Sequence, residues 1–311
     1  MNGEKNTPVP RVLFFGYSEV GYACLEMLLN RGVNVVAVFT HEGEAHETQW
    51  YRSVPKLAER HNIPVYTPAS LKDPQWTELI EKLQPDLLLS LYYRNMIPER
   101  IFSQAKLGAY NMHGSYLPRY RGRAPLNWAI IHGEDHTGVS LHVMEKSADT
   151  GDIIDQEKIP IGQQESAGDL TDRVRNAAVA VLSRQLDALL SGTAKRTPQD
   201  HSKATYFGKR TPEDGAIDWS KSSKEIFNLI RAVTRPFPGA FTRDPQGTPL
   251  TVWWAQIAEL SSHEHSTAPG TILQENPLRI RSADGALTLT DITRPPNAAP
   301  LKTGERLSAL Q

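Results

Sequence analysis

The sequence predicts an α/β protein: a Rossmann-like, mostly parallel sheet with helices on both faces, followed by a small β-rich, barrel-like (OB-like) domain. Two patterns support this prediction. In the first half of the chain, short and almost continuously apolar segments alternate with amphipathic ones, as expected of buried parallel strands separated by helices. After about residue 206, short strand-like segments are separated by Pro, Gly and Asp, which is typical of a compact β-rich domain. We therefore expect one domain over residues 1–203 and a second over residues 204–311.

The elements of the first half follow one another in regular order. Strands are expected at residues 12–15, 33–39, 64–66, 86–91 and 107–113, and helices at residues 20–30, 53–60, 74–83 and 167–190. Residues 138–144 alternate between apolar and polar side chains, which indicates a strand at a mixed edge of the sheet. A polar stretch that begins at Ser191 follows the long last helix.

The second half is expected to contain one helix and several short strands. The stretch 207–215 is rich in turn-forming residues, and a helix is predicted after it, over residues 223–234. The strand candidates are residues 250–255, 271–273, 278–281 and 286–290. Their shortness and the turns between them favour a small barrel.

Composition excludes several classes of protein. The net charge of the 311 residues is −1, which argues against non-specific binding of nucleic acid. The single cysteine, Cys24, cannot form an intrachain disulfide, and its apolar helical surroundings predict a buried structural thiol. No apolar run approaches the roughly 20 residues that a membrane span requires, and the N-terminus lacks the apolar core of a signal peptide. We expect a soluble cytoplasmic enzyme without a membrane partner. The sequence leaves a homo-oligomer possible.

Asn111, His113 and Asp149 form the most informative pattern in the chain. Asn111 and His113 are two residues apart on a predicted strand, so their side chains emerge on the same face. The end of a strand is where open α/β sheets place their sites. A carboxylate from Asp149, if the fold brings it near, would orient the imidazole and hold a proton on it. These three groups suit the transfer of an acyl group to an amine.

Three other observations bear on cofactors and substrates. The stretch Gly16-Tyr-Ser-Glu-Val-Gly21 lacks the middle glycine of a dinucleotide-binding loop, so we interpret it as a tight strand-to-helix turn and expect no NAD. No Cys/His cluster or His-Glu-x-x-His pattern occurs, so we expect no metal. The loop after His113 carries Arg119, Arg121 and Arg123, whose guanidinium groups match phosphate or carboxylate oxygens. Its position favours an anionic substrate or cofactor over a merely solvated loop.

The chain resembles the 10-formyltetrahydrofolate-dependent formyltransferases over residues 11 to about 287. The central motif of this resemblance is Asn111-x-His113 followed by Gly-Ser-x-Leu-Pro-x-Tyr-Arg-Gly, with Asp149 in an Ala-Asp-x-Gly turn. The branch that formylates UDP-4-amino-4-deoxy-L-arabinose, for lipid A modification in lipopolysaccharide biosynthesis, is the most similar. Residues 90–94, 120–128, 207–215 and 231–241 resemble that branch.

The resemblance implies roles for individual residues. Asn111, His113 and Asp149 match the catalytic asparagine, histidine and aspartate of the family. The positions that match folate-binding segments are Asn95, Met96, Ile97, Arg123, Glu145, Lys146, Ser147, Ala148 and Asp149. We expect the neighbouring loop residues Ser115, Tyr120 and Arg121 to contact the amino-sugar substrate. The implied co-substrate is 10-formyltetrahydrofolate, and the implied partner is a nucleotide sugar.

Alternatives remain open for the acceptor. The chain ends before the NAD-dependent decarboxylase domain of the bifunctional enzyme in that branch, so a dTDP-linked amino sugar is an alternative to the UDP-linked one. Methionyl-tRNA is a second alternative, but residues 41–50 lack the basic insertion of the tRNA enzymes. A non-catalytic folate or nucleotide sensor is a third. The intact trio Asn111, His113 and Asp149 argues against a sensor, because binding alone needs no proton transfer.

Overall fold

The computed structural model describes residues 9–41 and 51–308. The chain divides into two compact units, both of them discontinuous in sequence. The first unit comprises the residues up to Gly122, Thr137–Ile159 and Asp172–Phe207, and the second comprises Arg123–His136, Pro160–Thr171 and the residues from Gly208 onwards. The single boundary expected between residues 203 and 204 stays a prediction. Residues 42–50, on which the argument against a tRNA substrate partly relies, lie outside the described residues.

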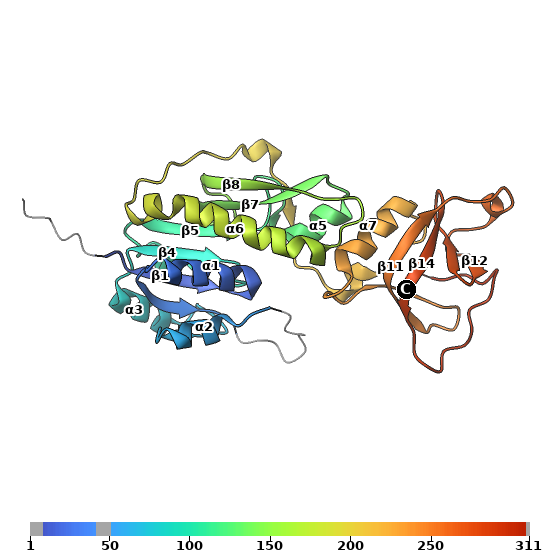
Figure 1. Cartoon of the computed structure of the whole chain (residues 1–311), viewed down its shortest axis with the longest axis horizontal. Coiled ribbons are helices and arrows are strands. Elements are labelled where there is room, and N and C mark those ends of the chain that lie inside the picture. The colour runs from blue at the N-terminus through green and yellow to red at the C-terminus, as the bar shows by residue number, and fades with distance from the viewer. Residues whose placement is uncertain (1–8, 42–50, 309–311) are drawn as a thin grey trace, which may run out of the picture. The chain divides into compact units, whose positions relative to one another are not determined.

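A seven-stranded sheet forms the centre of the first unit (Figure 1). Its strands, in spatial order, are β3 (Val65–Tyr66), β2 (Val35–Phe39), β1 (Val12–Gly16), β4 (Leu87–Leu91), β5 (Gly108–His113), β7 (His136–Val143) and β8 (Ile153–Pro160). The pairs from β3 to β5 are parallel, whereas β7 runs antiparallel to β5. The prediction of a mostly parallel sheet with a mixed edge is therefore confirmed.

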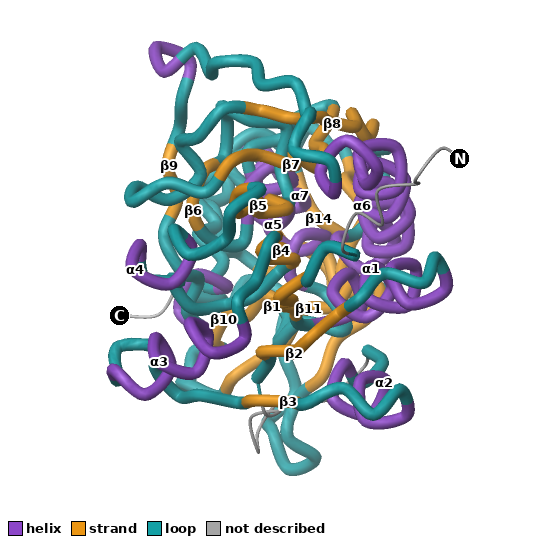
Figure 2. The backbone as a smooth tube through the Cα atoms, turned by 90° about the vertical axis from the view of Figure 1, so that its left-hand side faces the viewer, coloured by secondary structure: helices purple, strands orange, loops and turns teal. Residues whose placement is uncertain are grey.

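Helices cover both faces of this sheet. Figure 2 shows α1 (Ser18–Asn30), α2 (Val54–Arg60) and α6 (Ala167–Leu190) along one face, and α3 (Pro74–Leu83) and α4 (Glu99–Phe102) along the other. Side chains cap the N-termini of two of these helices by accepting hydrogen bonds from the backbone. The Ser53 hydroxyl accepts from the N–H of Lys56 at the start of α2, and the Asp73 carboxylate accepts from the N–H of Gln75 at the start of α3. Both helices also have a proline in the first turn, where its missing N–H costs nothing.

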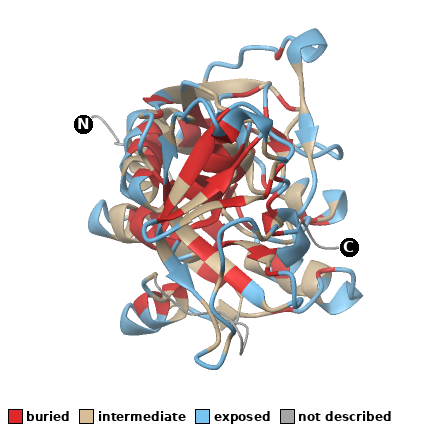
Figure 3. Ribbon diagram, turned by 90° about the vertical axis from the view of Figure 1, so that its right-hand side faces the viewer, coloured by how far each residue is buried: buried red, intermediate tan, exposed pale blue. Residues whose placement is uncertain are grey.

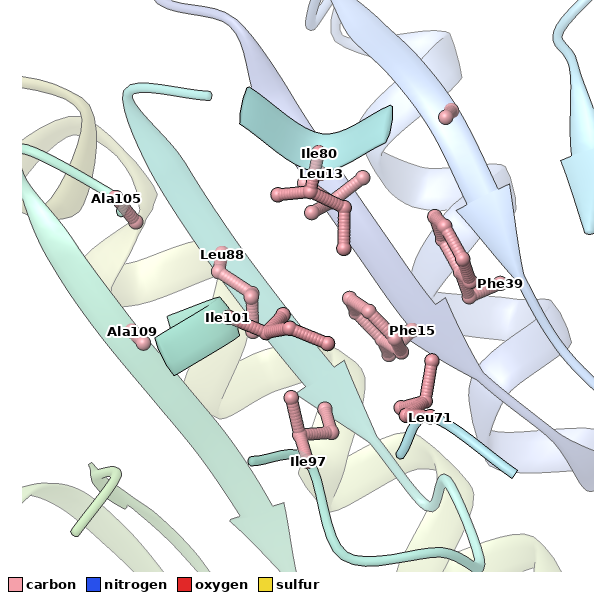
Figure 4. Packing of buried hydrophobic residues seen from close by; sticks show 11 residues of the cluster. Leu13, Phe15, Phe39, Leu71, Ile80, Leu88, Ile97, Ile101, Ala105 and Ala109 are labelled. Atoms are coloured by element: carbon pink, nitrogen blue, oxygen red, sulfur yellow. The ribbon is translucent and has the colours of Figure 1, made fainter. Parts of the chain in front are cut away.

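The core of the first unit lies between the sheet and its helices. Figure 4 shows one part of it, in which Phe15 and Phe39 stack with ring centroids 4.6 Å apart. Cys24 is completely buried on α1, and this burial raises the pKa of its thiol to about 12. The prediction of a buried structural thiol is confirmed.

The second unit is helical and β-rich. It contains α5 (Pro125–Ile131), α7 (Ser223–Val233) and an antiparallel sheet in the order β10 (Ala240–Arg243), β11 (Pro249–Ala258), β14 (Ala286–Thr293), β13 (Leu278–Arg281) and β12 (Ile272–Glu275). Short 3-10 helices lie at Pro212–Gly215 and Glu264–Ser266. A capping box formed by Ser222 and Glu225 starts α7.

The last described residues join the two edges of this sheet. Ser308 pairs with Arg243 at the end of β10, and Arg306 pairs with Thr271 just before β12. One short segment therefore hydrogen-bonds to both edges and closes the sheet on itself, as a barrel requires. Figure 3 shows the buried residues mainly on strands and the exposed ones mainly on loops and outer helix faces. Within the described ranges, we find no helix with the length and apolar character of a membrane span.

Candidate active site

Asn111 and His113 lie near the end of β5, and their side chains share one face of the sheet because they are two residues apart. The antiparallel register of β5 and β7 places Asn111 opposite His142. Side chains directly opposite one another on antiparallel strands come within contact distance. Asn111 Nδ2 accordingly lies 3.1 Å from His142 Nε2. The strand pairing therefore brings a second imidazole to the two predicted residues.

Asp149 comes from the loop between β7 and β8 and completes the cluster. Its Oδ1 lies 3.5 Å from His113 Nδ1 and 3.4 Å from His142 Nε2. Its Oδ2 accepts a hydrogen bond of 2.9 Å from the backbone N–H of Gly122. The structure thus brings the three predicted residues together, and their catalytic roles stay predictions. We refer to Asn111, His113, His142 and Asp149 as the Asp149 cluster.

Backbone carbonyls orient the two imidazole rings. His113 Nε2 lies 2.7 Å from the carbonyl oxygen of Tyr120. His142 Nδ1 lies 2.8 Å from the carbonyl oxygen of Val143. Because a carbonyl oxygen can only accept, each of these ring nitrogens carries the hydrogen of its contact. The other nitrogen of each ring therefore faces the Asp149 carboxylate.

Asp149 is ionised under ordinary conditions. Burial alone would raise the pKa of its carboxyl, because the charged form loses water. The two imidazole rings, of His113 and His142, and the backbone N–H of Gly122 all favour the carboxylate, and together they hold this pKa well below its usual range. A permanent negative charge therefore lies beside two buried imidazole rings.

Two unusual backbone conformations shape the site. Asp149 has a φ of +57°, in the left-handed region that few residues other than Gly, Asn and Asp adopt. Gly122 has a φ of +97°, and a Cβ on it would lie 2.2 Å from the carbonyl oxygen of Phe207. This close approach comes from the pairing of β6 (Arg121–Gly122) with β9 (Tyr206–Phe207). Only glycine leaves room for the N–H of residue 122 to reach Asp149.

The three residues predicted to contact the sugar are buried. Ser115, Tyr120 and Arg121 are 1%, 7% and 1% exposed. The Ser115 hydroxyl donates to the carbonyl of Arg119 over 2.7 Å, and the Tyr120 ring stacks on Phe207. These contacts lie within the loop around the Asp149 cluster, and the expected contact of the three residues with the sugar stays a prediction.

Arg121 is held by neutral acceptors. One terminal nitrogen of its guanidinium donates to the Tyr206 hydroxyl, and the other lies 2.6 Å from Gln199 Oε1 and 3.1 Å from His201 Nδ1. His201 belongs to the short 3-10 helix His201–Lys203. The Nε of Arg121 is buried and has no hydrogen-bond partner among the described residues, and the expected contact with an anionic substrate stays a prediction.

The residues predicted to bind folate differ in accessibility. Met96 is 59% exposed, whereas Ile97 is 4% exposed and packs in the core of the first unit (Figure 4). Asn95 Nδ2 donates to the carbonyl of Ala69 over 3.3 Å. The other exposed side chains in this set are those of Arg123, Glu145, Lys146, Ser147 and Ala148. Arg123 begins the segment of the second unit that directly follows Gly122 in the chain.

Sequence reasoning missed two buried polar residues at this site, His142 and Gln199. His142 lies two residues after Ser140 in a strand with alternating polarity, and a polar residue inside such a buried strand was the available signal. Gln199 lies in an irregular segment without a motif, so no local pattern marks it. Among the described residues, no group of three or more His, Cys, Asp or Glu could hold a metal ion.

Comparison with known families defines the class of protein. Residues 11–186 match the family described as formyl transferase, and residues 209–303 match the formyl transferase C-terminal domain. The chain therefore belongs to the formyl transferase family of enzymes.

Solved structures with the same fold include sugar N-formyltransferases. WlaRD, a sugar 3N-formyl transferase solved with dTDP and 5-N-formyl-THF, is 19% identical with a TM-score of 0.69, over 94% of this chain and 100% of its own. The N-formyltransferase from Helicobacter canadensis, solved with folinic acid and dTDP-3-aminofucose, is 20% identical with a TM-score of 0.68, over 94% and 98% of the two chains. HypX from Aquifex aeolicus, solved with tetrahydrofolic acid, is 21% identical with a TM-score of 0.63, over 92% of this chain and 44% of its own. At these identities the likeness establishes the fold.

Proposed function

We propose that this protein transfers a formyl group from 10-formyltetrahydrofolate to the primary amine of a nucleotide-linked amino sugar. The observation that carries the proposal is the Asp149 cluster, in which one carboxylate lies within 3.5 Å of two imidazole rings. The membership of the formyl transferase family supports the reaction class. The folate and dTDP-sugar ligands named for the neighbouring structures support the two substrates.

The cluster supplies the groups that this reaction needs. The neutral amine attacks the formyl carbon, an oxyanion develops, and the folate nitrogen leaves with a proton. Asn111 Nδ2 has two hydrogens, so one can point towards His142 while the other donates to the oxyanion. Losing such a donor typically costs about 10²–10³ in rate.

Proton transfer is the role we assign to His113. Because Nε2 donates to the Tyr120 carbonyl, Nδ1 is the nitrogen that would take the proton from the attacking amine and return it to the leaving nitrogen, which is typically worth about 10²–10⁴ in rate. A proton gained at Nδ1 would point at the ionised Asp149, 3.5 Å away. Asp149 therefore stabilises the charged ring without changing its own protonation state.

The acceptor that the sequence resemblance favours is UDP-4-amino-4-deoxy-L-arabinose. A dTDP-linked amino sugar is the second candidate, because dTDP and dTDP-3-aminofucose are named in the neighbouring structures. A small nucleotide sugar needs only a few positive groups, which suits the net charge of −1 better than a tRNA does.

A mass-spectrometric assay tests this proposal. The enzyme is incubated with a panel of UDP- and dTDP-linked amino sugars, with and without 10-formyltetrahydrofolate. We expect at least one sugar to gain the mass of one carbonyl group, and only when the formyl donor is present. If no amino sugar in the panel gains this mass while the folate binds, the protein fits the alternative of a sensor.

A further inference from the structure

Gln199 connects the turn that contains Asp149 and Gly151, in the loop between β7 and β8, to the buried side chain of Arg121. Its side chain is 6% exposed, and every hydrogen-bonding atom of its amide is used. Nε2 donates to the carbonyl oxygens of Asp149 over 3.0 Å and of Gly151 over 2.7 Å. Oε1 accepts from the Arg121 guanidinium over 2.6 Å. A neutral side chain with no place in the proposed chemistry thus contacts the backbone of the central carboxylate.

Arg121 fixes which way this amide points. A guanidinium only donates hydrogen bonds, so the atom of Gln199 that faces Arg121 must be the oxygen. The amide nitrogen then faces the turn and supplies one hydrogen to each carbonyl. The Tyr206 hydroxyl and His201 Nδ1 hold the guanidinium in turn. The orientation of the amide is therefore determined by its surroundings.

The turn needs such support because its backbone is unusual. Asp149 has a φ of +57°, a conformation that persists only where neighbouring groups impose it. At Gly151 a Cβ would lie 2.1 Å from the carbonyl oxygen of Val143, so the turn passes very close to the end of β7. If the carbonyl of Asp149 lost its donor, the peptide could rotate and carry the carboxylate away from His113.

We propose that Gln199 is a positioning residue for formyl transfer. It holds the backbone of Asp149 so that the carboxylate stays within reach of both His113 and His142. Because this inference rests on the proposed function, its test includes one readout of activity and one that needs no turnover.

The first test compares Gln199→Ala with Gln185→Ala. Gln185 also uses its amide to donate a hydrogen bond, to Asp155 on β8 over 3.1 Å, but it does not contact the Asp149 cluster. Small displacements of a reacting group can cost about 10² in rate. We expect kcat of Gln199→Ala to fall by about 10-fold to 100-fold with each KM within twofold, whereas Gln185→Ala keeps its kcat.

Gln199→Glu separates positioning from general stability. The carboxylate can still accept from Arg121, now as an ion pair, but it has no N–H for the carbonyls of Asp149 and Gly151. We expect a melting temperature within a few degrees of the wild type, together with a kcat reduced as in Gln199→Ala. A kcat within twofold of the wild type in this folded variant overturns the proposal.

A double-mutant cycle with Asp149→Gly supplies the readout without turnover. Glycine adopts a positive φ freely, so the support from Gln199 should matter less in that background. We expect Gln199→Ala to lower stability towards urea less in Asp149→Gly than in the wild type. Equal losses of stability in both backgrounds overturn the positioning role of Gln199. If the wild type formylates no amino sugar, that result counts against the proposed function and not against the positioning role.

Discussion

Asp149 determines the electrostatics of the candidate site at the scale of single residues. Its carboxylate lies beside His113 and His142 and accepts from the backbone of Gly122. These contacts outweigh the cost of burial, so the pKa of the carboxyl is depressed. Because Asp149 does not titrate near neutral pH, a limb of the pH–rate profile in that range belongs to other groups.

This depressed pKa predicts how stability depends on pH. A carboxyl that is more acidic in the folded than in the unfolded chain stabilises the fold above the unfolded pKa of about 3.9, and this contribution is lost as the pH falls towards the folded value. We expect the difference in unfolding free energy between the wild type and Asp149→Asn to be smaller at pH 3 than at pH 5, by about 1 kcal/mol. Urea titrations at the two pH values measure it, and an unchanged difference would show that Asp149 is not specially stabilised.

The two arginines on either side of Gly122 should respond differently to replacement. Arg123 is exposed, so Arg123→Ala should raise the KM for 10-formyltetrahydrofolate with a smaller effect on kcat. Arg121 is buried with several hydrogen bonds, so Arg121→Ala should instead lower the melting temperature. Steady-state kinetics and thermal melting of both variants test this. An unchanged KM for the folate in Arg123→Ala would show that the Arg123 side chain does not contact this co-substrate.

At the scale of elements, the pairing of β6 with β9 places the Gly122 N–H within hydrogen-bonding distance of the Asp149 carboxylate. Gly122→Ala should prevent this pairing, because its Cβ would lie 2.2 Å from a backbone oxygen of β9. We expect a loss of stability above about 2 kcal/mol. Gly247→Ala is the matched control, since Gly247 has a φ of +81° but no atom within 4 Å of the position that a Cβ would take. Similar melting temperatures for the two variants would mean that β6 and β9 separate easily.

Many of the regular elements were predictable from sequence, but some of them and the long-range contacts were not. The spacing of Asn111 and His113 placed both side chains on one face of β5, because a strand alternates strictly. The strand β8 was missed because its centre is a run of four polar residues and most of the strand is only half-buried. The α5 helix was missed because it is short and begins directly after the arginine loop. The link from Gln199 to Asp149 joins residues 50 positions apart, which no local pattern records.

At the scale of the whole molecule, the end of the described chain completes the second unit. Leu307 is 2% exposed, and its N–H donates to the carbonyl of Gly270. Leu307→Ala should therefore remove about 2–5 kcal/mol of stability from this unit. Ile257→Ala is the control, because Ile257 on β11 is 52% exposed and should lose far less. Urea unfolding of both variants measures whether the segment at residues 306–308 contributes to the stability of the fold. Equal urea midpoints for the two variants would show that it does not.

We propose that formyl transfer by this chain depends on the Asp149 carboxylate held beside His113. The most direct measurement is the kcat of Asp149→Asn for formylation of an amino sugar that the wild type accepts, together with its folate dissociation constant. Asparagine keeps the shape of the side chain and removes its charge. We expect turnover to fall by at least about 10² while folate binding stays measurable. A kcat near that of the wild type would contradict it.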